Sequence, residues 1–338
     1  MDDHYASEWK KAQIAQFIAE ARAVVKAPVS GLAQHHRDVF DRALRNVLAT
    51  ELAQTTYAQI IDGFPIVSVA KDARWGHIDH EHPVFANNHD KICPGAWEKM
   101  EEFHSSFNVG VLTMDKRLLH AYSAESVGSR AFQLRLIEMV AVAVHELAVL
   151  LYNMGDMQQH NDWKTWKPPK RHYQCQPSDP EWQWPELQPY LTLFFHFAFL
   201  EHEQYPEGVA DIVGYWAENR ILGGVVLFDR GESGNQCPEV YFQSGRRDDT
   251  HRIYALTDEQ KAKLASFFAA DTSSLDGTVL PILGDSNNRV RVDSEHAVFG
   301  FHVYRDKWER MVVDERDYPR RCVQTILEYP EIDDGNWG

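Results

Sequence analysis

The sequence predicts an α+β fold in which a mainly helical N-terminal two-thirds packs with a small mixed α/β C-terminal part. Apolar residues recur at helical spacing over much of the first 222 positions of the 338-residue chain. After the pair Gly223 and Gly224, short segments rich in β-branched and aromatic residues alternate like strands. The order of the segments shows no repeated βαβ rhythm, so a parallel sheet is not expected.

The N-terminal segments predict two amphipathic helices and one strand. Apolar residues recur every three or four positions over residues 8–26 and again over residues 36–61, where Asp62 and Gly63 end the pattern. PIVSVA, at residues 65–70, has the β-branched alternation of a short strand. We expect this strand to lead directly into a histidine-rich segment.

The middle of the chain predicts four more helices and one ordered loop. The helical segments are residues 96–107, 129–154, 187–204 and 209–222. Residues 161–189 hold too many prolines for regular structure and too many tryptophans for a floppy linker. We expect this Trp/Pro-rich loop to pack over the body of the protein and to rim a pocket.

The C-terminal part predicts strands around one helix. The expected strands are VVLFDR, EVYF, HRIYAL, RVRV and HAVFGFHVYR. Thr257, followed three residues later by Gln260, forms a capping box that opens the helix DEQKAKLASFFA. No flexible linker separates the helical part from the mixed part, so residues 1–338 are expected to form a single integrated domain. The alternative is a division into 1–222, mainly helical, and 223–338, α+β.

Composition and charge exclude several classes of partner. The formal net charge of −16 repels phosphate backbones, and basic residues occur in short pairs rather than stripes, so no nucleic-acid partner is expected. The most apolar stretch, LIEMVAVAVHELAVLLYNM, is interrupted by Glu138, His145 and Glu146, which favours a buried helix over a membrane span. The start, MDDHYASEWKKAQ, contains no apolar signal-peptide core. We therefore expect a cytoplasmic protein with no membrane partner.

The segment WGHIDHEHPVF, residues 75–85, concentrates histidines and carboxylates. His77 and Asp79 are two positions apart, so on extended backbone both project from one face, and His80 lies beside them. An H-x-D pair supplies two ligands of a 2-His-1-carboxylate site. This spacing predicts a divalent metal ion at His77, Asp79 and His80. The alternative is a solvated turn that binds no metal.

The helix expected over residues 129–154 carries polar groups on an otherwise apolar surface. Positions three or four apart form one stripe along it: Arg135, Glu138, Val142, His145, Val149 and Tyr152. Buried polar groups without partners are costly, so the polar members of this stripe should meet hydrogen-bonding partners or a water-filled cavity. Glu138 and His145 are therefore candidate catalytic residues.

A second expected helix, within TLFFHFAFLEHE, repeats this arrangement. On a helix, Thr192, His196, Phe199 and Glu203 would share one face. Two apolar helices, each with an interior histidine and a carboxylate seven residues away, predict a cavity between them. The predicted acid and base groups of this cavity are Glu138, His145, His196 and Glu203. The alternative is a structural network of hydrogen bonds.

The segment YWAENRILGGVVLFDRGESG runs from Tyr215 to Gly234. It resembles a segment of large families of uncharacterised ascomycete fungal proteins, some of them encoded near specialised-metabolite genes. The resemblance covers these twenty residues and implies a eukaryotic cytosolic setting, with no activity attached. By their chemistry, Glu218, Asp229 and Arg230 are either part of a site at a strand end or the charged side chains of a structural corner.

Two hypotheses about function follow. In the first, the protein is a cytosolic enzyme that acts on a small-molecule substrate through histidine and carboxylate groups, with a metal ion in the histidine-rich segment. In the second, it is a noncatalytic binding or scaffold protein that uses the Trp/Pro-rich loop as its partner surface. We favour the enzyme because ionisable groups occupy positions on apolar helix faces. The two hypotheses differ in what they expect of His145 and His196. If both are sealed by hydrogen bonds with no adjoining cavity, the enzyme hypothesis loses its main support.

Overall fold

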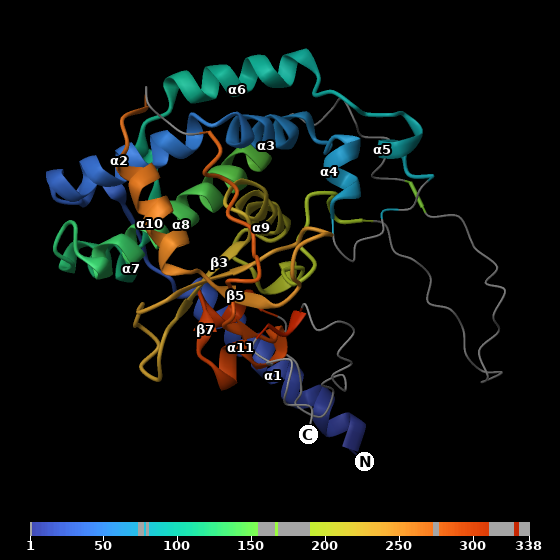
Figure 1. The fold of residues 1–338 in the computed structure, drawn as a ribbon. Coiled ribbons are helices and arrows are strands. Elements are labelled where there is room, and N and C mark those ends of the chain that lie inside the picture. The colour runs from blue at the N-terminus through green and yellow to red at the C-terminus, as the bar shows by residue number, and fades with distance from the viewer. Residues whose placement is uncertain are drawn as a thin grey trace.

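The computed structural model describes residues 2–73, 78, 81–154, 166–167, 190–272, 277–310 and 328–330. Within these residues, the N-terminal part forms a helical body and the C-terminal part contributes an antiparallel sheet (Figure 1). The predicted α+β fold, helical in its N-terminal part and mixed in its C-terminal part, is confirmed.

Helices dominate the chain up to residue 221. They are α1 (Asp2–Arg22), α2 (Gln34–Leu48), α3 (Glu51–Asp62), α4 (Val67–Lys71), α5 (Pro83–Ala86), α6 (Pro94–Ser106), α7 (Lys116–Ala124), α8 (Arg130–Met154) and α9 (Val209–Ile221). Two short strands, β1 (Lys26–Pro28) and β2 (Thr113–Asp115), pair antiparallel beside α7. The helices expected at residues 8–26, 96–107, 129–154 and 209–222 are confirmed, with shifted ends.

The C-terminal part is built on a sheet whose five strands, in the described part of the chain, follow the order β6-β5-β4-β3-β7. Neighbouring strands are antiparallel throughout. The capping box of Thr257 and Gln260 is confirmed and opens a helix. The elements are β3 (Val225–Asp229), β4 (Val240–Gln243), β5 (Ile253–Ala255), α10 (Asp258–Ala269), β6 (Arg291–Val292), α11 (Ser294–Gly300) and β7 (Val303–Tyr304).

The strand β3 is buried on both faces, which explains its continuous apolar sequence. Val226 and Phe228 belong to the main hydrophobic core that includes α8 and α9. Val225 and Leu227 point to the opposite face of the sheet and join a second apolar cluster with Tyr215. The sheet therefore lies between two packed layers, with its centre held by apolar contacts on each side.

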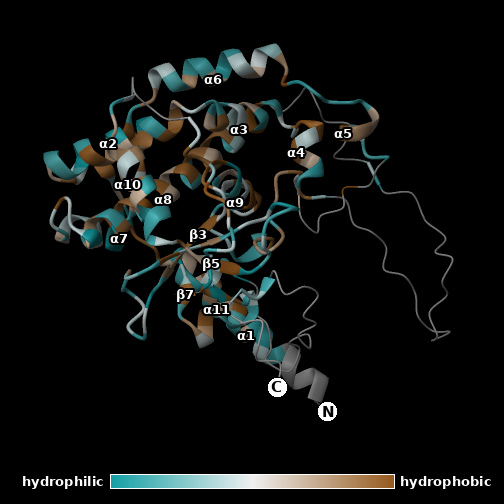
Figure 2. Ribbon diagram, viewed as in Figure 1, coloured by the Kyte–Doolittle hydropathy of each residue, from teal (hydrophilic) through white to brown (hydrophobic). Residues whose placement is uncertain are grey.

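The helices α8 and α9 pack against each other through the middle of the molecule. In the view of Figure 1, α3 lies above this pair, α6 lies above α3, and β3 lies below the pair. Hydrophobic residues concentrate on α8, α9 and β3, whereas α6 carries more hydrophilic ones (Figure 2). Among the described residues, no helix is both long and apolar enough to span a membrane.

Two expectations for residues 36–70 are wrong. The single helix expected over residues 36–61 is divided at Thr50, whose hydroxyl accepts a hydrogen bond from the N–H of Ala53 at 3.2 Å and so caps α3. The segment expected to be a strand forms the helix α4. Val67 and Ala70, three positions apart, are both buried there, so helical spacing and not alternation carries its apolar side chains inward.

The helix expected over residues 187–204 is also wrong in its described part, residues 190–204. A short 3-10 helix, η5 (His202–Gln204), forms there, and the preceding residues follow turns. His196 accounts for this, because its Nδ1 accepts the N–H of Ala198 and its carbonyl accepts the N–H of Phe199. Such local side-chain bonds compete with the hydrogen bonds of a helix.

The last expected strand, residues 296–305, is a strand only at its end. Ser294–Gly300 forms α11, which buries Ala297 and Val298. His302 then adopts a positive φ of 55°, and the chain turns into the two-residue strand β7. Alternating hydrophobicity over so few residues does not distinguish a strand from a short helix.

Two glycines make the turn from α9 into β3. Gly223 has a φ of +115°, and a Cβ there would lie 1.9 Å from the carbonyl oxygen of Ile282. A Cβ at Gly224 would lie 2.9 Å from the backbone of Gln243 in β4. The tight packing of this corner, and at Gly223 the left-handed backbone as well, therefore requires residues without a side chain.

Replacement of Gly223 by alanine should lower the free energy of unfolding by about 2 kcal/mol or more, because it adds backbone strain and a clash with a carbonyl oxygen. Urea denaturation measures the change. Gly95→Ala is the matched control, since nothing lies within 4 Å of a Cβ at that position in α6. Its unfolding free energy should not fall. Equal stability of the two variants would contradict the geometry of this corner.

Candidate functional site

A cavity of about 490 Å³ lies between α8, the start of α9 and the segment from β7 to the 3-10 helix η7 (Lys307–Glu309). Side chains from the end of α1 and from α7 complete its walls. Its volume falls in the range of small-molecule sites. Most of its polar side chains come from three segments that are distant in sequence, so the fold itself assembles the site.

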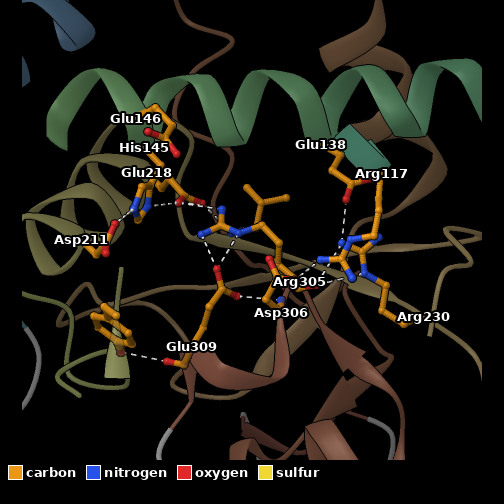
Figure 3. A network of polar contacts seen from close by, with 12 residues as sticks. Arg117, Glu138, His145, Glu146, Asp211, Glu218, Arg230, Arg305, Asp306 and Glu309 are labelled. Carbon is orange, nitrogen blue, oxygen red and sulfur yellow. Dashed lines mark hydrogen bonds and ion pairs between the residues drawn. The ribbon is translucent and has the colours of Figure 1, made fainter. Parts of the chain in front are cut away.

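At the inner wall of the cavity, the imidazole of His145 lies between two carboxylates of α9 (Figure 3). Its Nδ1 is 2.9 Å from Oε1 of Glu218, and its Nε2 is 3.0 Å from Oδ1 of Asp211. α9 approaches the ring closely because it carries Gly214 at this level, where a Cβ would lie 2.5 Å from the ring. The three charged side chains are all buried.

This arrangement requires His145 to carry a positive charge. Each ring nitrogen faces a carboxylate oxygen, and the imidazolium alone has an N–H donor at both nitrogens. Burial lowers the pKa of His145, but the hydrogen bonds to Asp211 and Glu218 outweigh burial and raise the pKa to about 9. His145 is therefore a fixed cation near neutral pH, with both nitrogens already engaged.

Arg305 binds Glu218 from the other side. Its Nη1 donates to Oε1 of Glu218 at 2.8 Å, and its Nε donates to Oε1 of Glu309 at 2.8 Å. Burial raises the pKa of Glu218, but Arg305 and His145 more than offset this and hold the pKa below its ordinary value. A chain of alternating charges thus crosses the protein: Asp211, His145, Glu218, Arg305 and Glu309.

A second buried cluster lies nearer the N-terminus of α8. Glu138 accepts hydrogen bonds from Nη1 of Arg135 at 2.7 Å and from Nη2 of Arg230 at 2.6 Å. Burial raises the pKa of Glu138, yet these two guanidinium groups lower it overall. Arg230 also donates to the carbonyl oxygen of Arg305 at 3.2 Å, which joins this cluster to the first (Figure 3).

Asp306 follows Arg305 in the chain and lies in the cavity wall with 35% of its side chain exposed. Partial burial and the negative charge of Glu309 raise the pKa of Asp306 to about 7. Among the described residues, its nearest cation is Arg117, whose Nη2 lies 4.0 Å away and is already bonded to Asp115 at 2.6 Å. Asp306 is therefore a carboxyl group whose pKa is raised above the ordinary aspartate value.

The structure brings together two of the four predicted acid and base residues. Glu138 and His145 both line the cavity, as the stripe on α8 predicts. His196 is sealed elsewhere: its Nε2 donates to the carbonyl of Gln243 at 3.1 Å, and burial lowers its pKa to about 3. Glu203 is exposed on η5 and does not line the cavity. Of the two histidines, His145 therefore reaches the cavity and His196 does not.

The segment from Tyr215 to Gly234 supplies further parts of the site. Glu218 belongs to the first cluster and Arg230 to the second. Asp229 instead accepts the N–H of Gly231 at 2.8 Å within the turn after β3. This segment is therefore both a structural corner and a source of site residues.

Two predicted features fall outside the described residues. His77, Asp79 and His80, the predicted metal ligands, are among them. So is the Trp/Pro-rich loop, except for Trp166 and Lys167. Within the described ranges, no group of three or more histidine, cysteine, aspartate or glutamate side chains is arranged to hold a metal ion. The described site consists of ion pairs between protein side chains.

Asp211, Asp306 and Glu309 are not among the site residues predicted from the sequence. The charged run RDKWER, residues 305–310, is the pattern that could have drawn attention to two of them. Runs of charge are usually solvated faces, so the pattern alone does not reveal that Arg305 and Glu309 are buried. Both are buried because residues 305–310 lie beside α8 and α9 in the folded chain.

No protein-family model, curated protein or solved structure matches the chain. The function is therefore argued from the cavity and its charged groups.

Replacement of His145 by glutamine should lower the free energy of unfolding by about 3–5 kcal/mol at pH 6, because it leaves the buried Asp211 without a cation and Glu218 with Arg305 alone. The loss should depend on pH. The pKa of His145 is raised from 6.5 to about 9 in the folded protein. Its contribution is thus complete below about pH 6.5 and disappears as the pH rises through 9.

Urea denaturation of both proteins between pH 6 and pH 10 tests this expectation. The difference in unfolding free energy between wild type and His145→Gln should shrink by about 3 kcal/mol over this interval. His35→Gln is the control, because His35 is exposed on α2, and its difference from wild type should stay constant. A difference for His145→Gln that does not change with pH would show that the imidazole is neutral.

Proposed function

We propose that the protein is an enzyme that acts on a small polar metabolite in this cavity, with Asp306 as its general acid or base. The observation that carries the proposal is a metabolite-sized cavity whose wall holds a carboxyl group of raised pKa without a full ion pair. A group that titrates near the working pH transfers protons most effectively. Perturbed carboxyl groups in cavities are common at active sites.

The buried charges around Asp306 have a supporting role in this proposal. Arg305 is fixed by Glu218 and Glu309, and Asp306 is the next residue in the chain. The backbone N–H of Asp306 also donates to Oε2 of Glu309 at 3.0 Å. These bonds hold the backbone that carries the reactive carboxyl group, which reduces the motion of that group during proton transfer.

In this proposal, Glu138 and His145 are not the acid and base groups that the sequence predicts. Both nitrogens of His145 and both oxygens of Glu138 are occupied by ion-pair partners. They position charge in the wall and exclude water, and they do not exchange protons with a substrate. A cytoplasmic setting and a divalent metal at His77, Asp79 and His80 remain part of the proposal.

The alternative proposal is a noncatalytic binding or scaffold protein. Its predicted partner surface, the Trp/Pro-rich loop, lies almost wholly outside the described residues. The cavity serves a binding protein as well as an enzyme, so the two proposals differ in whether any compound is converted. A test of turnover therefore decides between them.

Purified protein incubated with a defined mixture of amines, amino acids, organic acids, sugars and nucleosides should consume one compound and form a product, followed by mass spectrometry. Asp306→Asn should lower the rate by about a hundredfold or more, since it removes the proton-accepting group. With Asp306 as base, kcat/KM should rise with pH through about 7, because the carboxylate is the active form.

Asp248→Asn is the matched control, because Asp248 is exposed and does not line the cavity. It should keep the wild-type rate, and thermal melting should show that both variants are folded. No conversion by the wild-type protein would favour the binding protein. Equal rates for the two variants would remove Asp306 from the chemistry.

A further inference from the structure

The buried charges beside the cavity are paired with one another, whereas the exposed Arg22 at the end of α1 lines the cavity without an ion pair among the described residues. The four cations Arg135, His145, Arg230 and Arg305 are paired with the four carboxylates Glu138, Asp211, Glu218 and Glu309. At the cavity edge, Lys26 is paired with Glu146 and Arg117 with Asp115. Among the described carboxylates of the wall, Asp306 has the weakest ion pair, because Arg117 lies 4.0 Å away and is bonded to Asp115.

An unmatched carboxylate in a partly buried position is costly while it is ionised. The protein lowers this cost in the empty cavity by holding the proton, which is why the pKa of Asp306 is raised. A positively charged ligand group beside Asp306 would lower the cost further. A negatively charged group would meet Asp306 and the nearby Glu309 and would be repelled.

A second observation, independent of these charges, points to a ligand with hydrogen-bonding groups. Tyr215 is 1% exposed and lines the cavity, and no described residue forms a hydrogen bond with its hydroxyl. Burial raises the pKa of Tyr215 well above its ordinary value, so the hydroxyl keeps its proton. This oxygen is not among the fully buried polar atoms without a partner, so it reaches the space of the cavity, where a ligand N–H can bond to it.

The other side chains of the wall suit the hydrocarbon part of such a ligand. Leu118 and Ala121 of α7 and Val142 of α8 give one apolar side of the cavity. Trp308 places an aromatic ring in the same wall. Aromatic faces attract organic cations, and apolar surface binds their carbon chains.

We propose that the cavity binds a small organic amine in its protonated form, with the ammonium group at Asp306 and the carbon chain along Leu118, Ala121 and Val142. The inference rests on the proposed function in that the amine is then the substrate. The ammonium group can pass one proton to the carboxylate of Asp306, which leaves a neutral amine and a neutral carboxyl group. A free amine is a nucleophile, so the same contact both recognises and activates the substrate.

The test uses sets of compounds of the same shape and different charge. One set is tyramine, its alcohol analogue tyrosol and 4-hydroxyphenylacetate, and another is cadaverine, 1,5-pentanediol and glutarate. Isothermal titration calorimetry with the full-length protein measures each affinity. The amines should bind, and the alcohols should bind at least about tenfold more weakly because they form no ion pair with Asp306. The carboxylates should bind weakest, because their negative charge is repelled by that of Asp306.

Two variants should change the affinity for the amines in opposite directions. Asp306→Asn should weaken amine binding by about tenfold or more, and should leave the affinity for the alcohols nearly unchanged. Arg117→Gln should strengthen amine binding severalfold, because it removes the cation 4.0 Å from Asp306. Arg117 is largely exposed, so this variant remains informative even if Asp306→Asn does not fold. Asp248→Asn should not change any affinity.

Three results would overturn the inference: tighter binding of the carboxylates than of the amines, amine affinities that neither variant changes, or no binding of any amine in the panel. These results are separable from failure of the enzyme itself. Conversion of a compound without an amino group would keep the enzyme and remove the amine. Amine binding through Asp306 without conversion of any compound would keep the amine and remove the enzyme.

Discussion

The structure depends on one buried carboxylate, Glu218 in the last turn of α9. It is fully buried, and it binds the imidazolium of His145 on α8, the guanidinium of Arg305 beyond β7 and the backbone N–H of Val226 in β3. A charge withdrawn from water in this way is tolerated only when several partners replace the lost hydration. This side chain therefore ties together the helix pair, the sheet and the C-terminal segment, which also pack through two apolar clusters.

The same arrangement determines where the cavity lies. His145 occupies space at the α8–α9 contact that only a glycine at position 214 leaves free, and the cavity lies beside this contact. Arg305 is held beside Glu218 and Glu309, and this fixes the next residue, Asp306, in the cavity wall. The pairing of the buried charges thus shapes the cavity wall, and Asp306 is the group that we propose for the ligand.

Much of the helical body could be predicted from sequence, because α8 and α9 repeat apolar residues over three or more turns and Gly223 marks the corner after them. Polar positions on the apolar surface of α8 drew attention to Glu138 and His145, which line the cavity, but the cavity predicted between α8 and a helix around His196 does not form. Their partners were harder to find, because Asp211 and Glu309 become neighbours only through the fold. The helix expected around His196 failed for a local reason: the side chain of that histidine bonds to its own turn, which no periodicity reveals.

We infer that Asp306 is a carboxyl group without a close ion pair, since Arg117, its nearest cation among the described residues, lies 4.0 Å away. Carbon-13 NMR of the aspartate carboxyl groups, with the Asp306 resonance assigned by its absence in Asp306→Asn, measures its titration directly. The titration midpoint should lie near the pKa of about 7 and should fall when tyramine is bound, because an ammonium group stabilises the carboxylate. A midpoint near the ordinary aspartate value of about 4, unchanged by the amine, would contradict this inference.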